Sequence, residues 1–306
     1  MHQSVLLEEA IDALAIKPDG IYLDATFGRG GHSQAILAKL NANGRLLAID
    51  RDPEAAAFAQ QKFSNDKRFI LFQGAFSQLE QFAKEQNVIG KVNGILMDLG
   101  VSSPQLDDPH RGFSFLQDGP LDMRMDTTSG EPVATWLNRA KEADIAQVLF
   151  EYGEERFSRR IARAIVRERQ VEPIQTTGRL AEIVSTANPA WEKHKHPATR
   201  AFQAFRIFIN KELAELQTGL EQALTVLAVE GRLAVISFHS LEDRIVKRFI
   251  RQQSRDENLP TDLPVVASAM RSRMKNLGRP IKPSAEEVAV NIRARSAILR
   301  VAEKLQ

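Results

Sequence analysis

The sequence predicts an α/β fold, in which an open parallel sheet is interrupted by a mainly helical insertion. Two patterns in its 306 residues support this prediction. Short apolar runs alternate with helix-like segments from the N-terminus to Pro104, as they do in βαβ units. Only helical patterns follow over 136–210, before an apolar run returns at 233–238. We therefore expect one domain formed by 1–106 together with 211–306, and an inserted domain at 107–210.

The individual elements follow from apolar runs and turn signals. Asn43-Gly44 indicates a turn before the second strand, and Asn93-Gly94 precedes the fourth. Ser240 and Asp243 have the spacing of a capping box, which would start a helix after the last strand. The predicted strands are 21–25, 45–49, 69–73, 95–99 and 233–238, and the first predicted helices are 31–40 and 53–63.

Composition excludes several classes of protein. The chain has no cysteine, so disulfide frameworks, cysteine–zinc sites and thiol nucleophiles are excluded. Glu8 and Glu9 stand where a signal peptide would be apolar, and no apolar run reaches the ~18 residues that span a bilayer. These features predict a cytoplasmic protein without a membrane partner.

Charge is distributed unevenly along the chain. The net charge is only +2, but segment 156–210 sums to +7 and segment 244–306 to +8. Basic blocks beside acidic ones are expected where one face of a protein meets a polyanion. Solvated helix faces would give the same distribution, so charge alone leaves both interpretations open.

A glycine-rich loop lies between the first predicted strand and its helix. Gly28, Gly30 and Gly31 let the backbone pass close to a ligand, and the helix N-terminus offers free N–H groups. Asp50 ends the next strand, where an acidic side chain can accept both hydroxyls of a ribose. This combination predicts a nucleoside-containing cofactor, although a glycine-rich turn without a ligand remains the alternative.

The loop also limits which cofactor can bind. A dinucleotide fingerprint would place a third glycine where this chain has Ser33, and the chain has no phosphate-binding loop of the GxxxxGK[ST] type. An acid before the loop (Asp24) and a later strand-end acid (Asp98) resemble the S-adenosylmethionine-dependent methyltransferases. Phe76 follows the third strand, where an adenine ring could lie against it.

The fourth strand leads into Asp98-Leu-Gly-Val-Ser-Ser-Pro104, at the place where amino-group methyltransferases of nucleic acids commonly carry Asp/Asn-Pro-Pro-Tyr/Phe. This motif and several others are similar to those of the bacterial 16S ribosomal RNA (cytosine-N4) methyltransferases, the RsmH or MraW family. The similarity covers nearly the whole chain. Its longest blocks are DATFGRGGHS (24–33), DLGVSSPQLDD (98–108), YGEERFSRRIARAI (152–165), HPATRAFQAFRIFINKEL (196–213) and ISFHSLEDRIVKRF (236–249).

The resemblance implies a Rossmann-like S-adenosylmethionine-dependent methyltransferase sheet with an inserted helical domain. It implies that the substrate is a cytidine in the decoding region of 16S rRNA, within the small ribosomal subunit or a late assembly intermediate. A homodimer is compatible with the sequence, which does not fix the oligomeric state. The cofactor-binding residues implied in this way are Gly28, Gly30, Gly31, His32, Asp50, Phe76, Asp98 and Gln105.

Methyl transfer to an exocyclic amine requires an acceptor for the amine hydrogens, because the N4 lone pair is delocalised into the ring. Asp98 is the first candidate for this acceptor. Groups of Ser102, Ser103 and Pro104 are the second. A role for Asp98 in cofactor binding alone is an equal alternative. No metal is expected, since His194 and His196 are too close together and too isolated for a zinc site.

RNA must also be held, and the target base is expected to be flipped out of its stack. We expect phosphate contacts from the arginine-rich segment 156–169 and from 264–285, and stacking surface from Phe113 and Phe115. The tentative RNA-binding residues are Arg124, Arg159, Arg163, Arg273, Lys275 and Arg279.

Three other functions compete with this hypothesis. A methyltransferase of DNA or of a small molecule would share the fold. A nicotinamide-dependent oxidoreductase is disfavoured by Ser33. A non-enzymatic RNA-binding factor is disfavoured because Gly30, Asp50 and Asp98 are all present.

Overall fold

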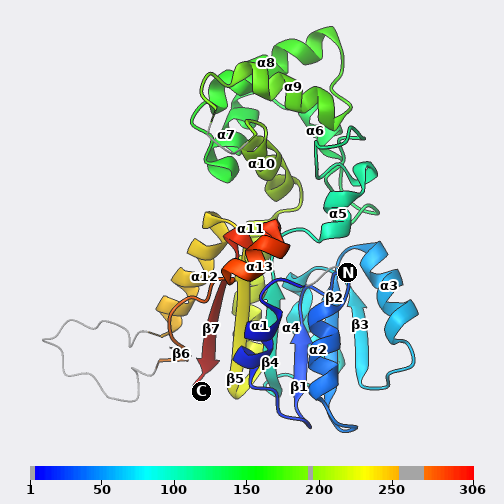
Figure 1. The fold of residues 1–306 in the computed structure, drawn as a ribbon, viewed down its shortest axis with the longest axis vertical. Coiled ribbons are helices and arrows are strands. Elements are labelled where there is room, and N and C mark those ends of the chain that lie inside the picture. The colour runs from blue at the N-terminus through cyan, green and yellow to red at the C-terminus, as the bar shows by residue number, and fades with distance from the viewer. Residues whose placement is uncertain (1–3, 192–195, 255–271) are drawn as a thin grey trace, which may run out of the picture. The chain divides into compact units, whose positions relative to one another are not determined.

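The computed structural model describes residues 4–191, 196–254 and 272–306, and it divides the chain into two compact units (Figure 1). The sheet unit comprises Met1–Gly100 and Leu213–Gln306, and the helical unit comprises Val101–Glu212. The helical unit therefore starts at Val101, ahead of the expected boundary at 107. The reason is packing, because Val101 and Leu106 lie against the core of the helical unit.

The sheet unit contains seven strands in the order β3-β2-β1-β4-β5-β7-β6. The first five are parallel to their neighbours, which confirms the predicted α/β class. The last two form an antiparallel edge that the sequence did not indicate. The strands are β1 (Ile21–Asp24), β2 (Arg45–Asp50), β3 (Phe69–Gln73), β4 (Val92–Asp98), β5 (Leu227–Ser237), β6 (Met274–Asn276) and β7 (Ile298–Lys304).

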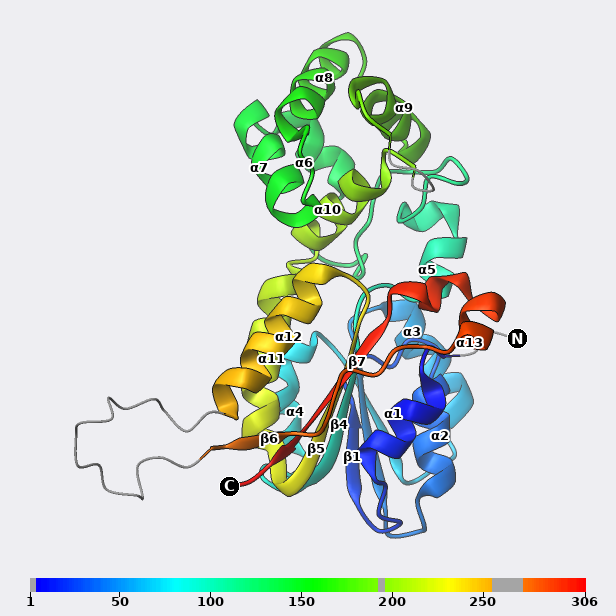
Figure 2. The same ribbon diagram turned by 60° about the vertical axis from the view of Figure 1, so that its left-hand side comes forward.

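Helices cover both faces of this sheet, as Figures 1 and 2 show. One face packs on α1 (Leu7–Leu14), α2 (Gly31–Lys39) and α3 (Pro53–Phe63). The other packs on α4 (Leu79–Glu85), α11 (Glu212–Val226) and α12 (Ser240–Gln253). Neighbouring strand residues such as Leu46 and Leu47 join opposite clusters, because side chains alternate between the faces. The remaining short helices are η1 (Phe76–Gln78), α13 (Ala285–Val290) and η4 (Ile292–Ser296).

The helical unit has a core of its own. Fully buried side chains from successive helices, including Leu149, Ile161, Leu180 and Phe205, form one apolar cluster. Its elements are α5 (Ser103–Asp107), η2 (Pro109–Arg111), α6 (Val133–Arg139), α7 (Glu142–Gly153), α8 (Ser158–Val171), α9 (Thr177–Ala187) and α10 (Thr199–Ile209). In the described part of the chain, none of the helices is long and apolar enough to cross a membrane.

The fourth strand starts earlier than predicted, because Asn93 and Gly94 lie inside β4. Asn93 Oδ1 accepts the Ile21 N–H at 2.9 Å, and the register between β4 and β5 shifts between Val92 and Gly94. A Cβ on Gly94 would lie 2.9 Å from the Tyr22 ring. The two residues therefore serve strand pairing and close packing.

Candidate functional site

Three acidic residues end neighbouring parallel strands. Asp24 ends β1, Asp50 ends β2 and Asp98 ends β4. The chain places β2 and β3 on one side of β1 and then crosses to β4 on the other side, so the strand order reverses between β1 and β4. Ligands of open α/β sheets bind outside the carboxyl ends of the strands at such a reversal.

The glycine loop between β1 and α2 has a backbone that favours glycine. Gly28 and Gly30 have φ values of 55° and 69°, in the left-handed region. A Cβ on Gly30 would lie 2.7 Å from the Phe27 ring, and one on Gly31 would lie 2.0 Å from Ser4 Oγ. The loop therefore packs closely against its own unit and ends at the N-terminus of α2.

Asp50 ties this loop to the end of β2. Its Oδ2 accepts the Gly28 N–H at 2.7 Å, and its Oδ1 accepts the Asp52 N–H at 2.9 Å. Burial raises the pKa of Asp50 to about 6, helped by the charges of Asp52 and Asp24 and opposed by the two hydrogen bonds. Each carboxylate oxygen can accept a second hydrogen bond, so the side chain can still bind two hydroxyls.

Asp24 is buried beneath the loop. Ser33 Oγ donates to its Oδ2 at 2.7 Å, and the Thr26 N–H donates to its Oδ1 at 3.1 Å. Burial raises the pKa of Asp24, and the hydrogen bonds only partly offset this effect. Ser33, which argued against a dinucleotide, thus holds a strand-end acid. No motif or spacing in the sequence indicates this contact.

Asp98 has a buried oxygen, Oδ1, that lacks a hydrogen-bond partner among the described residues. Burial raises the pKa of Asp98 well above its ordinary value, and the charges of Asp24 and Glu242 add to the effect. His32 Nδ1 lies 3.7 Å from Asp98 Oδ2. Burial lowers the pKa of His32 to about 4, so this histidine is neutral at neutral pH and supplies no counter-charge. An unpaired buried acceptor of this kind suits a ligand that donates or carries positive charge.

Phe76 begins η1 directly after β3 and is half-buried. A Cβ on Gly219 of α11 would lie 2.8 Å from its ring, so the ring rests against that helix. The Gly74 N–H donates to the Asp50 carbonyl at 2.8 Å and joins the ends of β2 and β3. The structure thus brings together the glycine loop, Asp50, Phe76 and Asp98 in the sheet unit.

The other four predicted site residues belong to the helical unit. Ser102 is the N-cap of α5, and Ser103 and Pro104 form its first turn. Gln105 Oε1 accepts the Ser102 N–H at 2.9 Å, which closes a capping box. Gln105 therefore has a structural role within α5 that the sequence analysis did not anticipate.

The predicted RNA-binding residues differ in how they are held. Arg124 forms a two-pronged ion pair with Asp122, with both contacts at 2.8 Å, and only 18% of its side chain is exposed. This pairing balances its charge and orders the loop. Arg163 is exposed and lies 3.8 Å from Glu142. The remaining four, Arg159, Arg273, Lys275 and Arg279, are exposed.

Phe113 does not offer the expected stacking surface, because it is buried in the core of the helical unit. Phe115 is only partly buried, and its ring lies 4.7 Å from that of Phe202. Its role in stacking stays a prediction. The portion 264–271 of the predicted basic segment, and His194, lie outside the described residues.

Comparison with known proteins decides the family. The MraW methylase family matches residues 1–305. The chain belongs to this family. It is 58% identical to the ribosomal RNA small subunit methyltransferase H of Pseudoalteromonas atlantica, over 99% of this chain and 98% of that one. It is 59% identical to the protein of the same name from Nitrosococcus oceani, over 99% and 96% of the two chains.

As a member of the MraW methylase family, the chain is a methyltransferase, and S-adenosylmethionine is its methyl donor. The strand-end residues fit this donor. Asp50 offers acceptors for ribose hydroxyls, and the unpaired Oδ1 of Asp98 is suited to a cationic ligand. Glu242, which raises the pKa of Asp98 from the first turn of α12, is a residue of this region that the sequence analysis missed.

Proposed function

We propose that this protein transfers a methyl group from S-adenosylmethionine to the N4 amino group of a cytidine in the decoding region of 16S rRNA. The RNA is presented in the cytoplasm within the small ribosomal subunit or a late assembly intermediate. The observation that carries the proposal is the unpaired, buried Oδ1 of Asp98 beside the glycine loop. The names of relatives at 58% and 59% identity support the rRNA substrate.

The donor, when bound, supplies a methyl group that is already activated for in-line displacement, so positioning is the main task of the protein. Asp50 holds the ribose hydroxyls and Phe76 lies against the adenine. The backbone of the loop at Gly28, Gly30, Gly31 and His32 contacts the rest of the donor, together with Asp98 and Gln105.

Asp98 also accepts a hydrogen bond from the N4 amine of the target. This contact draws the nitrogen lone pair out of conjugation with the ring and orients it for attack. As the methyl–sulfur bond breaks, the donor would leave as a neutral thioether, and the N4 proton would pass to the Asp98 carboxylate. The raised pKa of Asp98 favours its neutral form in the ligand-free protein. Positive charge brought by the donor lowers that pKa and favours the carboxylate. Ser102, Ser103 and Pro104 contribute hydroxyl and carbonyl acceptors.

Exposed basic side chains hold the RNA phosphates. Arg159 and Arg163 lie on α8, while Lys275 lies on the edge strand β6, with Arg273 and Arg279 on either side of it. Lys and Arg contacts to phosphate fix the register of a nucleic acid without reading its sequence. Arg124 acts indirectly, because its pairing with Asp122 shapes the loop that follows η2.

The test is to incubate the purified protein with labelled S-adenosylmethionine and small subunits from cells that lack the gene. The RNA is then digested and the labelled nucleoside identified. We expect the label in N4-methylcytidine. Label in another nucleoside would overturn the proposed substrate atom. No label, with donor binding intact, would favour an RNA-binding factor instead.

A further inference from the structure

His239 occupies the N-cap position of α12, immediately after β5. The sequence predicted Ser240 with Asp243 as the capping box, which is wrong. Glu242 is the partner of the box, and Asp243 instead pairs with Arg300 at 2.7 Å. Imidazole is not among the preferred N-cap groups, which are the side chains of Ser, Thr, Asp and Asn. Capping alone therefore does not account for a histidine at this position.

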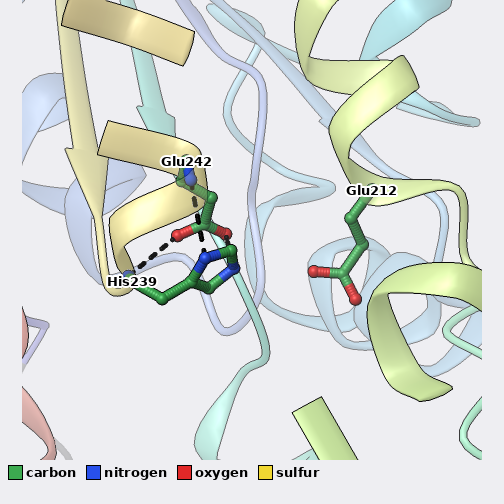
Figure 3. A group of neighbouring side chains, drawn as sticks. All are labelled: Glu212, His239 and Glu242. Atoms are coloured by element: carbon green, nitrogen blue, oxygen red, sulfur yellow. Dashed lines mark hydrogen bonds and ion pairs between the residues drawn. The ribbon is translucent and has the colours of Figure 1, made fainter. Parts of the chain in front are cut away.

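Glu242 fixes the histidine, as Figure 3 shows. Its Oε2 accepts the backbone N–H groups of Phe238 at 2.9 Å and His239 at 3.3 Å. The Glu242 N–H in turn donates to His239 Nδ1 at 3.5 Å, a long hydrogen bond. A neutral imidazole whose Nδ1 accepts must carry its hydrogen on Nε2. The ring is thereby held as a donor through Nε2.

This donor is unsatisfied. Only 10% of the His239 side chain is exposed, and Nε2 has no hydrogen-bond partner in the described part of the chain, although Glu242 Oε1 lies 3.1 Å away. Buried polar groups in native proteins are nearly always hydrogen-bonded. An unsatisfied N–H at a ligand-binding edge of the sheet therefore points to a contact that forms with the substrate.

His239, which carries this N–H group, follows the strand next to the one that ends at Asp98. Strands β4 and β5 are parallel neighbours, with Asp98 aligned to Ile236, and the Leu99 N–H donates to the Ile236 carbonyl at 2.9 Å. Asp98 at the end of β4 and His239, two residues after β5, thus carry polar atoms of opposite kind: an acceptor, Oδ1, and a donor, Nε2. Neither atom has a hydrogen-bond partner among the described residues, although Nε2 lies 3.1 Å from Glu242 Oε1.

Cytosine presents the complementary pattern. Its amine N4 is a donor, and the adjacent ring nitrogen N3 is an acceptor; uracil has an acceptor at O4 and a donor at N3. Enzymes that act on flipped bases read this edge by hydrogen bonds. Resting on the proposed function, we propose that His239 determines base specificity: its Nε2–H donates to N3 of the target cytosine while Asp98 accepts from N4.

The test variant is His239→Ser, which keeps a good N-cap but has no donor at the position of Nε2. We compare two measurements on small subunits: KM for particles with the unmethylated target cytidine, and Ki for particles whose target is mutated to uridine. The wild-type protein should prefer the cytidine particle, and the variant should show a smaller preference, because Asp98 still accepts from N4. Without this one hydrogen bond to the base, kcat/KM should fall about 5- to 150-fold.

Two controls separate recognition from folding. The affinity of His239→Ser for S-adenosylmethionine should stay at its wild-type value. The variant should remain folded at the assay temperature, although loss of the buried ring lowers its unfolding temperature. Ser284→Asn, a cap substitution at α13 in the same unit, should change none of the readouts. An unchanged preference for cytidine in His239→Ser would overturn the inference. A fall in its affinity for S-adenosylmethionine as large as the fall in its activity would overturn it as well. Failure of the proposed function would give a different result, because the wild-type protein itself would then label another nucleoside.

Discussion

The buried acids at the strand ends carry the chemistry at the scale of single residues. Asp24, Asp50 and Asp98 all have raised pKa values, and burial is the largest cause in each case. Such shifts persist where a site is prepared for a ligand that compensates them. For Asp98 and Asp50 this leads to two predictions.

Asp98→Asn removes the acceptor charge but keeps the size of the side chain. We expect turnover to fall about 100-fold or more, the usual scale for a group that handles a reacting proton. Affinity for S-adenosylmethionine should also fall, because Asp98 contacts this cationic donor, but by less than turnover. Stability should not fall, because the variant has no buried carboxyl to ionise. Single-turnover methylation and calorimetric donor binding measure the two effects. Near-normal turnover would refute the assignment, and a loss confined to donor affinity would leave Asp98 as a cofactor ligand only.

Asp50 should make donor affinity depend on pH. Ribose hydroxyls donate to its carboxylate, so affinity should fall as the pH is lowered through the Asp50 pKa of about 6. The stability of the ligand-free protein should change in the opposite direction. Because the folded pKa lies above the unfolded value, this group's contribution to the free energy of unfolding decreases as the pH rises from about 4 through about 6.

Asp50→Asn is the matching variant. It should bind the donor about 10-fold or more weakly, since hydrogen bonds to a charged group contribute roughly 1.5–3 kcal/mol. The difference in affinity between wild type and variant should shrink at low pH. A constant difference between pH 5 and pH 8 would show that the ionisation of Asp50 does not matter for binding.

The candidate site was predictable from the sequence where a residue ends a strand. Asp50 and Asp98 end apolar runs, and Gly28 and Gly30 lie in the loop after another such run; parallel strands bring these positions to one edge. Contacts between side chains were not predictable. The hydrogen bond from Ser33 to Asp24 and the pairing of Arg124 with Asp122 depend on rotamers and burial that no spacing encodes.

At the scale of elements, the loop before α2 should be the part of the site most sensitive to shape. Gly30→Ala adds a Cβ 2.7 Å from the Phe27 ring at a φ of 69°. Left-handed strain and overpacking together should lower the free energy of unfolding by about 2–5 kcal/mol. Donor affinity should be lost as well, because the loop backbone must shift.

Gly90→Ala is the matched control. Gly90 has nearly the same φ, 68°, but a Cβ there meets nothing within 4 Å. Gly90→Ala should lower the free energy of unfolding by only about 1–2 kcal/mol and leave donor affinity unchanged. Denaturant unfolding and calorimetry distinguish the variants. Equal effects of the two substitutions on donor affinity would contradict the role given to the loop.

The type of most helices and strands could be predicted from the sequence, but the residues at which they begin and end were less predictable. The strand and helix alternation of the first 100 residues is local and strongly patterned. The capping of α12 was predicted one residue too late, because Glu242 folds back on the N–H groups of Phe238 and His239. The antiparallel strands β6 and β7 went unrecognised, since their pairing with β5 joins segments far apart in the sequence.

At the scale of the whole molecule, exposed basic residues should make RNA binding depend on salt. Neutralising Arg273, Lys275 and Arg279 together should weaken binding to small subunits and flatten the dependence of affinity on salt concentration. The slope should fall by roughly 0.7–0.9 for each phosphate group that these side chains no longer neutralise. Binding measured over a series of salt concentrations tests this.

The control removes three exposed lysines from the α2, α3 and β4 regions, Lys39, Lys62 and Lys91, and so changes the net charge equally. It should leave the slope near the wild-type value. A slope unaffected by the first substitution, or affected equally by both, would mean that the region around β6 makes no specific contact with RNA.

The organisation into two units was anticipated in kind, because strand patterns stop where helical patterns begin. The residue at which the helical unit begins was harder to predict from the sequence. The short helix α5 lies in a segment rich in turn residues, and only its packing against the helical core assigns it to that unit.

The most direct measurement is to locate the methyl group in the RNA. Small subunits from cells lacking the gene are incubated with the donor and either wild-type protein or Asp98→Asn, and 16S rRNA fragments are analysed by mass spectrometry. We expect one added methyl group, on N4 of a decoding-region cytidine, with the wild-type protein and almost none with the variant. A methyl group on another atom or region, or equal incorporation by both proteins, would contradict it.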